Sequence, residues 1–176
     1  MIGIQNGVLK KYIGNEQKII VPDGVTSIEE FAFGTADNEE IFCPNLEEVV
    51  LPESLTEISR FAFYRCESLK KMNLPEQLQK LGTEAFSQCK NLEEITIPEG
   101  VTEIPYGTFS RCYALRKIHI PETVTEIKEK AFYGCSPEKL VIPDKVDIVA
   151  RKAPVLKDGE SYLPFDAPEN GVTPMP

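Results

Sequence analysis

Residues 92–112 read LEEITIPEGVTEIPYGTFSRC, and the same order of apolar residues, proline, phenylalanine and cysteine returns every 23 residues along most of the chain. The cysteines show this interval most clearly, at Cys43, Cys66, Cys89, Cys112 and Cys135. Self-similarity at a period of about 20 to 50 residues is typical of proteins in which each repeat packs only against its neighbours. The sequence therefore predicts a stacked array.

Each repeat begins with a segment of strand character that ends at a proline. In residues 92–98, Ile95 and Ile97 alternate with a polar residue, as in a strand with one buried side. Pro98 has no N–H to donate and a fixed φ, so it ends the strand and turns the chain. Every repeat carries such a proline, which predicts a corner in each rung.

A second apolar pair and a tight return segment complete the repeat. Val101 and Ile104 form the pair, and the following residues direct Phe109 and Cys112 toward the interior. We therefore expect a β-rich, leucine-rich-repeat solenoid of stacked parallel strands with short helical or 3-10 turns, in about five to six rungs of 23 residues.

The repeat also predicts how the chain is divided. Residues 1–18 contain Asn6-Gly7, a favoured two-residue hairpin turn, and are expected to cap the first rung. The solenoid is expected to occupy residues 19–146, with a seven-residue insertion within residues 34–42. Residues 147–176 carry five prolines and are expected to form a capping segment followed by a mobile tail.

The composition is that of an ordinary globular domain, with 41% hydrophobic and 27% charged residues and a net charge of −9. Basic residues do not cluster, which argues against a nucleic-acid partner. No segment suggests membrane insertion, and no basic and apolar leader opens the chain. The partner is expected to be a protein or a glycan, and neither its identity nor the oligomeric state follows from these residues.

The cysteines are expected to be core residues. Their number is odd, so they cannot all pair within one chain, and buried free thiols pack as small apolar groups. A disulfide or a metal site is the weaker alternative, because no Cys-x-x-Cys or Cys/His spacing occurs. We expect no metal site and no cofactor.

The insertion marks the best candidate for partner binding. Phe31 and Phe61 share a repeat position that Glu84, Gly107 and Lys130 occupy in later rungs. Together with neighbouring residues they form a candidate apolar patch, which comprises Phe31, Phe42, Phe61, Tyr64 and Ile41. The alternative is a satellite cluster hidden beneath the inserted loop.

An acidic residue follows the corner proline in every repeat. The resulting acidic column comprises Asp23, Glu53, Glu76, Glu99, Glu122 and Asp144. It could attract a cation or a basic partner, or it could be a solvated corner. No catalytic residue is expected, because the only histidine, His119, lies at an outward strand position without a partner at motif spacing.

The repeat resembles the BspA-type leucine-rich repeats of bacterial surface proteins. The resemblance rests on the pattern LxxIxIPxxVTxIxxxAFxxC, seen at Leu46, Val49, Leu51, Pro52, Leu55, Ile58, Ala62, Phe63 and Cys66 and repeated through Cys135. It implies a non-enzymatic scaffold for protein-protein or adhesion-type binding at the cell surface. The alternative function is a cation-dependent carbohydrate-active or carbohydrate-binding protein that uses the acidic column. Free thiols and the missing leader would also suit a reducing interior.

Overall fold

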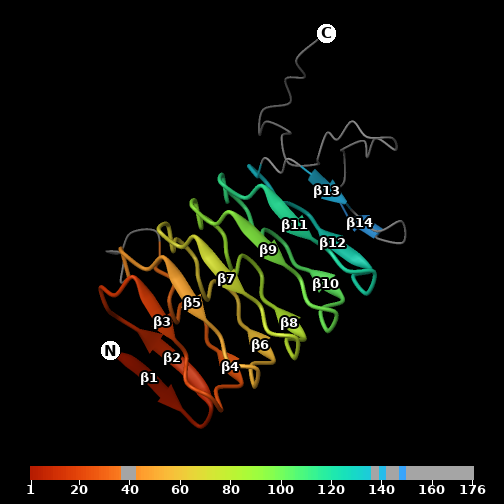
Figure 1. Ribbon diagram of the computed structural model, residues 1–176. Coiled ribbons are helices and arrows are strands. Elements are labelled where there is room, and N and C mark those ends of the chain that lie inside the picture. Colours follow the sequence, from red (N-terminus) through yellow and green to blue (C-terminus); the bar gives the residue numbers. More distant parts are fainter. Residues whose placement is uncertain (37–42, 136–138, 142–146, 150–176) are drawn as a thin grey trace.

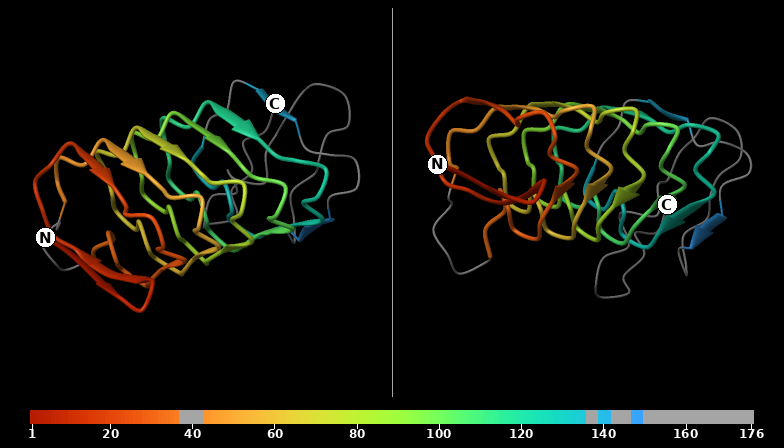
Figure 2. Two further views of the ribbon diagram at one scale, coloured as in Figure 1. Left: turned by 60° about the horizontal axis from the view of Figure 1, so that its bottom comes forward. Right: turned by 90° about the horizontal axis from the view of Figure 1, so that it is seen from below.

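The computed structural model describes residues 1–36 and 43–135, together with the backbone of strands β13 (Lys139–Val141) and β14 (Asp147–Val149). These residues form a β-solenoid of about five turns (Figure 1). The rungs follow one another in a single row from the N-terminal hairpin (Figure 2). The predicted repeat solenoid of parallel strands is thus confirmed.

Each rung contributes one strand to each of two sides of the solenoid. The first side holds β3 (Lys18–Ile20), β5 (Glu48–Val50), β7 (Lys71–Asn73), β9 (Glu94–Thr96), β11 (Lys117–His119) and β13. The second side holds β2 (Val8–Tyr12), β4 (Ser27–Ile28), β6 (Glu57–Ile58), β8 (Lys80–Leu81), β10 (Glu103–Ile104), β12 (Glu126–Lys128) and β14. Neighbouring strands pair in parallel with repeat positions in register, as in Ile95 opposite Ile118, except between β7 and β9 and between β8 and β10, where each side is divided into two sheets.

The corner prolines act as the sequence predicts. At each described corner the residue three positions after the proline donates its N–H to the proline carbonyl, as Leu78 does to Pro75 at 3.0 Å. This hydrogen bond closes a turn between the two strands of a rung.

The N-terminal hairpin is also present. Strand β1 (Ile2–Gln5) pairs antiparallel with β2, and the turn residues Asn6 and Gly7 both have positive φ, at 52° and 74°. Both angles suit a type I′ turn, which explains the Asn-Gly sequence. At the other end, β14 pairs with β12 and lies beyond residue 146, where the sequence suggested that the regular pattern stops.

The third side of each rung consists of turns, and the described residues contain no helix. Amides here alternate between two kinds of acceptor. Tyr64 donates to the Phe61 carbonyl three residues back at 3.0 Å, whereas Phe63 donates to Ala85 of the next rung at 2.8 Å. The alternation satisfies the backbone of this side and ties adjacent rungs together.

The core is built from columns of identical residues. Six rings form the core stack along the interior. Phe33, Phe63, Phe86, Phe109 and Phe132 lie nearly parallel to one another, and Tyr12 begins the row with its ring tilted by 36° from that of Phe33. All five cysteines are free and buried, which confirms their core role. The thiol of each later cysteine donates to the carbonyl of the core phenylalanine one rung earlier, as Cys89 does to Phe63 at 3.3 Å.

Charged residues support the register of the first side. Lys70 pairs with Glu47 at 2.9 Å, and Arg116 pairs with Glu93 at 3.0 Å. The alternating charges of the sequence therefore place opposite signs on adjacent rungs. Each exposed pair contributes only about 0.2 to 1 kcal/mol, so the ladder favours the correct register more than it stabilises the fold.

Cys43 is expected to react with iodoacetamide before the other four cysteines. Its Sγ lies 3.9 Å from Cys66 Sγ, and the hydrogen bond between the two thiols lowers the pKa of Cys43. Burial raises the pKa of Cys89 and Cys112, which keeps these thiols protonated and unreactive. Peptide mass spectrometry after timed alkylation at pH 8 measures the order.

The control for this experiment is the same reaction in guanidinium chloride, where all five thiols should react at similar rates. Faster reaction of Cys89 or Cys112 than of Cys43 in the folded protein would contradict the hydrogen bonding described for this column.

Candidate functional site

The third side of the solenoid, which we call the turn face, gathers the aromatic residues that do not belong to the core stack. It comprises residues 29–36, 59–67, 82–90, 105–113 and 128–135. The six described aromatic residues outside the stack all lie on it, and they are Phe31, Phe61, Tyr64, Tyr106, Tyr113 and Tyr133. The described strands of the first and second sides carry no outward aromatic residue. Aromatic residues are enriched at binding interfaces, so this face is the candidate site.

Three of these rings form one contact group, the aromatic cluster of Phe31, Phe61 and Tyr64. The Phe31 and Phe61 rings stack at 5.1 Å with 10° between their planes, and Tyr64 meets Phe61 edge-on at 5.4 Å. Both phenylalanines are half-buried, whereas Tyr64 is only 9% exposed. The structure thus brings together three of the five residues in the candidate patch, and Ile41 and Phe42 lie outside the described residues.

The two phenylalanines occupy backbone positions that disfavour them. Phe31 and Phe61 have φ of 53° and 56°, in the left-handed region, and Gly107 fills the same position two rungs after Phe61. A residue with a side chain costs about 1 to 2 kcal/mol there relative to the right-handed region. The stacked pair returns about 0.5 to 1.5 kcal/mol of this cost. Glu84 and Lys130 share this conformation, with φ of 50° and 57°, so the strain belongs to the repeat and the rings alone distinguish the first two rungs.

A second left-handed position lies four residues further along each turn. It holds Arg65, Gln88, Arg111 and Gly134, with φ between 60° and 76°. Long polar side chains therefore project from a position where glycine would fit best. Spacing alone revealed the shared repeat positions, but their backbone conformation could not be predicted from it.

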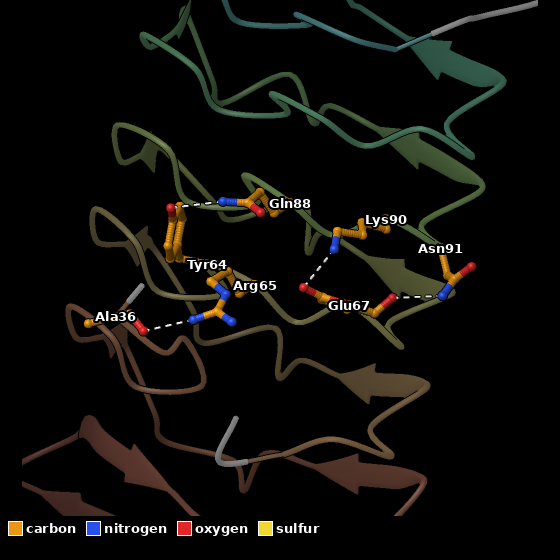
Figure 3. A network of polar contacts seen from close by, with 7 residues as sticks. All are labelled: Ala36, Tyr64, Arg65, Glu67, Gln88, Lys90 and Asn91. Atoms are coloured by element: carbon orange, nitrogen blue, oxygen red, sulfur yellow. Dashed lines mark hydrogen bonds and ion pairs between the residues drawn. The ribbon is translucent and has the colours of Figure 1, made fainter. Parts of the chain in front are cut away.

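Polar side chains link the rungs beside the aromatic cluster (Figure 3). Gln88 donates its side-chain amide to the Tyr64 hydroxyl at 2.9 Å, and Arg65 donates to the Ala36 carbonyl at 2.8 Å. Lys90 pairs with Glu67 at 2.8 Å. These contacts fix the orientation of Tyr64 and of the charged groups around it.

The acidic column occupies the corner between the two strand-bearing sides, away from the turn face. Its described members, Asp23, Glu53, Glu76, Glu99 and Glu122, are all exposed, and Asp144 lies outside the described residues. Among the residues that the structure describes, no three histidine, cysteine or acidic side chains come together as a metal site. The column keeps its sequence interpretation as a solvated corner or a surface for a basic partner.

The first side carries a shallow depression of about 530 Å³ over β5, β7 and β9, lined by Val50, Asn73 and the charged residues around them. His119 is exposed on β11 of the same side. Neither feature joins an activated nucleophile to a base, so neither suggests catalysis.

Stacked parallel strands on two sides, turns on the third and a column of inward apolar residues define a leucine-rich-repeat solenoid of the β-rich kind. The chain belongs to the BspA-type leucine-rich repeat family, because the family model of the BspA type leucine rich repeat region matches residues 38–153 in six copies. Members of this family of surface proteins are typically binding or adhesion scaffolds and generally non-enzymatic.

Solved structures of bacterial proteins are similar to this chain. A leucine rich cell surface protein from Faecalibacterium prausnitzii A2-165 is 28% identical with a TM-score of 0.59, covering 85% of this chain and 50% of that protein. The T. pallidum leucine rich repeat protein is 26% identical with a TM-score of 0.66, and the match covers 85% of this chain and 82% of that protein. A leucine-rich repeat protein from Eubacterium ventriosum, 16% identical with a TM-score of 0.64 and coverage of 88% and 50%, shares the fold.

This chain therefore spans half the length of the Faecalibacterium and Eubacterium proteins. A search of curated proteins found no match. In the part of the chain that the structure describes, no helix is long and apolar enough to cross a bilayer.

Proposed function

We propose that this chain is a non-enzymatic binding module that makes adhesion-type contacts with a partner protein through the aromatic cluster. The observation that carries the proposal is the confinement of the six described aromatic residues outside the core to the turn face. Aromatic and arginine side chains supply most of the binding energy at protein interfaces. Phe31 and Phe61 are the rings at a repeat position that holds no aromatic residue in the later rungs.

The rigidity of the solenoid supports this role. Backbone hydrogen bonds join each turn to the next rung, so the rings are held in place before a partner arrives. A preorganised surface loses less conformational entropy on binding.

A cation-dependent carbohydrate protein that uses the acidic column is the second candidate, and it has less support. Its carboxylates are exposed along one corner, and none of the described ones belongs to a group of three potential ligands. Calcium sites need several oxygen ligands around one point.

Site-specific photocrosslinking tests the proposal. A benzophenone amino acid at position 61 preserves an aromatic ring in the aromatic cluster, and the same amino acid at position 76 places it on the acidic column. In an extract of the source organism or its surroundings, position 61 should give a discrete crosslinked protein and position 76 should not. Crosslinking of the same protein from position 76 alone would overturn the proposal.

A further inference from the structure

A small hollow of about 130 Å³ lies on the turn face among three tyrosines, Tyr64, Tyr106 and Tyr133. We call it the tyrosine hollow. It shares Tyr64 with the aromatic cluster, but its other walls come from later rungs. Nothing in the proposed protein-binding function requires it.

A glycine forms part of the wall of the hollow. Gly107 stands at the first left-handed position, where the rungs before and after carry Glu84 and Lys130. A Cβ built on Gly107 would lie 2.8 Å from Glu84 Cγ, closer than ordinary contact allows. The Glu84 side chain therefore occupies the space that a side chain at position 107 would need, and this places Glu84 against the wall of the hollow.

The walls of the hollow offer both a hydrogen-bond acceptor and hydrogen-bond donors. The Glu84 carboxylate and the Arg111 guanidinium both line it, and neither forms an ion pair or side-chain hydrogen bond with a described residue. Most other described basic side chains are paired with an acid, as Arg60 is with Glu30 at 2.9 Å. Lys130 also lines the hollow but has an interaction of its own, so a ligand would meet one acceptor and one planar donor that no described residue uses.

This combination selects among ligand classes. An apolar group would leave both charges without partners. A carboxylate could pair with Arg111, but it would be repelled by Glu84 and would leave Glu84 without a donor. A cation could pair with Glu84, but it would be repelled by Arg111 and would leave Arg111 without an acceptor. Neighbouring hydroxyl groups satisfy both walls, because one donates to Glu84 while the next accepts from Arg111.

Tyrosine rings complete the match to a sugar. Tyr106 is 38% exposed, so its ring offers an apolar surface with a polar rim. The volume is well below the roughly 300 to 1,000 Å³ of pockets for drug-sized ligands, which restricts the hollow to a single ring. We propose that the tyrosine hollow binds one neutral hexose unit of a glycan, with Glu84 and Arg111 recognising adjacent hydroxyls.

Titration of the ¹⁵N-labelled protein followed by NMR tests the proposal. The probes are neutral trisaccharides of glucose, galactose, mannose or N-acetylglucosamine, and a uronic acid trisaccharide. At least one neutral probe should bind with a Kd of about 1 mM, as expected for a weak single-ring site, and should shift the amides of residues 106–111. The uronic acid probe should bind at least about tenfold more weakly.

Two variants and a control make the test specific. Gly107→Lys fills the hollow with a residue that the next rung carries at the same φ, and Arg111→Ala removes the donor. Each should weaken binding at least about tenfold, whereas Tyr113→Ala, on an exposed ring that does not line the hollow, should leave the Kd unchanged. Circular dichroism confirms that each variant is folded, and Arg111→Ala serves alone if Gly107→Lys is not.

Three results would overturn the proposal. They are the absence of shifts with every neutral probe up to about 20 mM, binding that neither variant weakens, and a preference for the uronic acid probe. A fourth variant, with Phe31→Ser and Phe61→Ser, should keep sugar binding. Its behaviour separates a failure of this proposal from a failure of the aromatic cluster as a protein-binding site.

Discussion

Replacing Phe86 with alanine is expected to lower the free energy of unfolding by about 3 to 5 kcal/mol. The Phe86 ring is fully buried at the middle of the core stack, 5.2 Å from the ring of Phe63 and 5.4 Å from that of Phe109. Its removal leaves a cavity that the two neighbouring rungs cannot close, because hydrogen bonds between the turns, from Phe63 N–H to Ala85 and from Phe86 N–H to Thr108, fix the rungs to each other. Guanidinium chloride unfolding followed by circular dichroism measures the change.

The effect should be large relative to the whole fold, since domains of this size are stable by only about 5 to 15 kcal/mol. Each rung also packs only against its neighbours, so a defect in the middle weakens both halves of the array. Tyr113→Ala is the matched control, because this ring is 55% exposed and its loss should change stability by less than about 0.5 kcal/mol. Equal losses for the two variants would show that the ring stack does not hold the rungs together.

Gly82→Ala is expected to cost about 3 kcal/mol, at the upper end of the range for overpacking. A Cβ on Gly82 would lie 2.2 Å from the backbone nitrogen of Arg60 and 2.3 Å from the carbonyl carbon of Ser59. Real Cβ atoms essentially never come within 3.0 Å of another heavy atom, so the two rungs would have to move apart. Thermal and denaturant unfolding of the variant measure the loss.

Gly24→Ala separates this mechanism from the general cost of replacing a glycine. Gly24 has a φ of 85°, and a Cβ added there would meet no atom within 4 Å, so the variant should lose only about 1 to 2 kcal/mol through backbone strain. If Gly82→Ala is no more destabilising than Gly24→Ala, close approach of the rungs at Gly82 is not the cause.

The close approach of two rungs at Gly82 could not be predicted from the sequence, and the reason is physical. Equivalent positions hold Ser59 and Pro105 one period away and Lys128 two periods away, which suggests that a side chain is tolerated there. The separation of two backbones at one rung depends on small displacements that the repeat pattern does not encode. By contrast, the corner at each proline and the stack of phenylalanines follow from residue type and spacing, and the structure confirms both.

The candidate site likewise has one part that the repeat pattern predicts and one part that it does not. The shared repeat position of Phe31 and Phe61 predicts that their rings meet, because equivalent residues of adjacent parallel rungs lie about 4.8 Å apart. The tyrosine hollow could not be predicted in this way. It depends on the left-handed backbone of Gly107 and on the direction of side chains from three rungs, which the repeat pattern does not encode.

The affinity of the crosslinked partner protein for a Phe31→Ser and Phe61→Ser double variant tests most directly the claim that the turn face is the functional surface. The double variant removes the stacked pair, whose rings are only half-buried and lie outside the core stack, so the fold should remain intact. Its Kd should rise at least about tenfold, whereas a Glu53→Ala and Glu76→Ala control on the acidic column should keep the wild-type Kd. An unchanged Kd for the double variant, or a loss confined to the acidic-column control, would contradict the account.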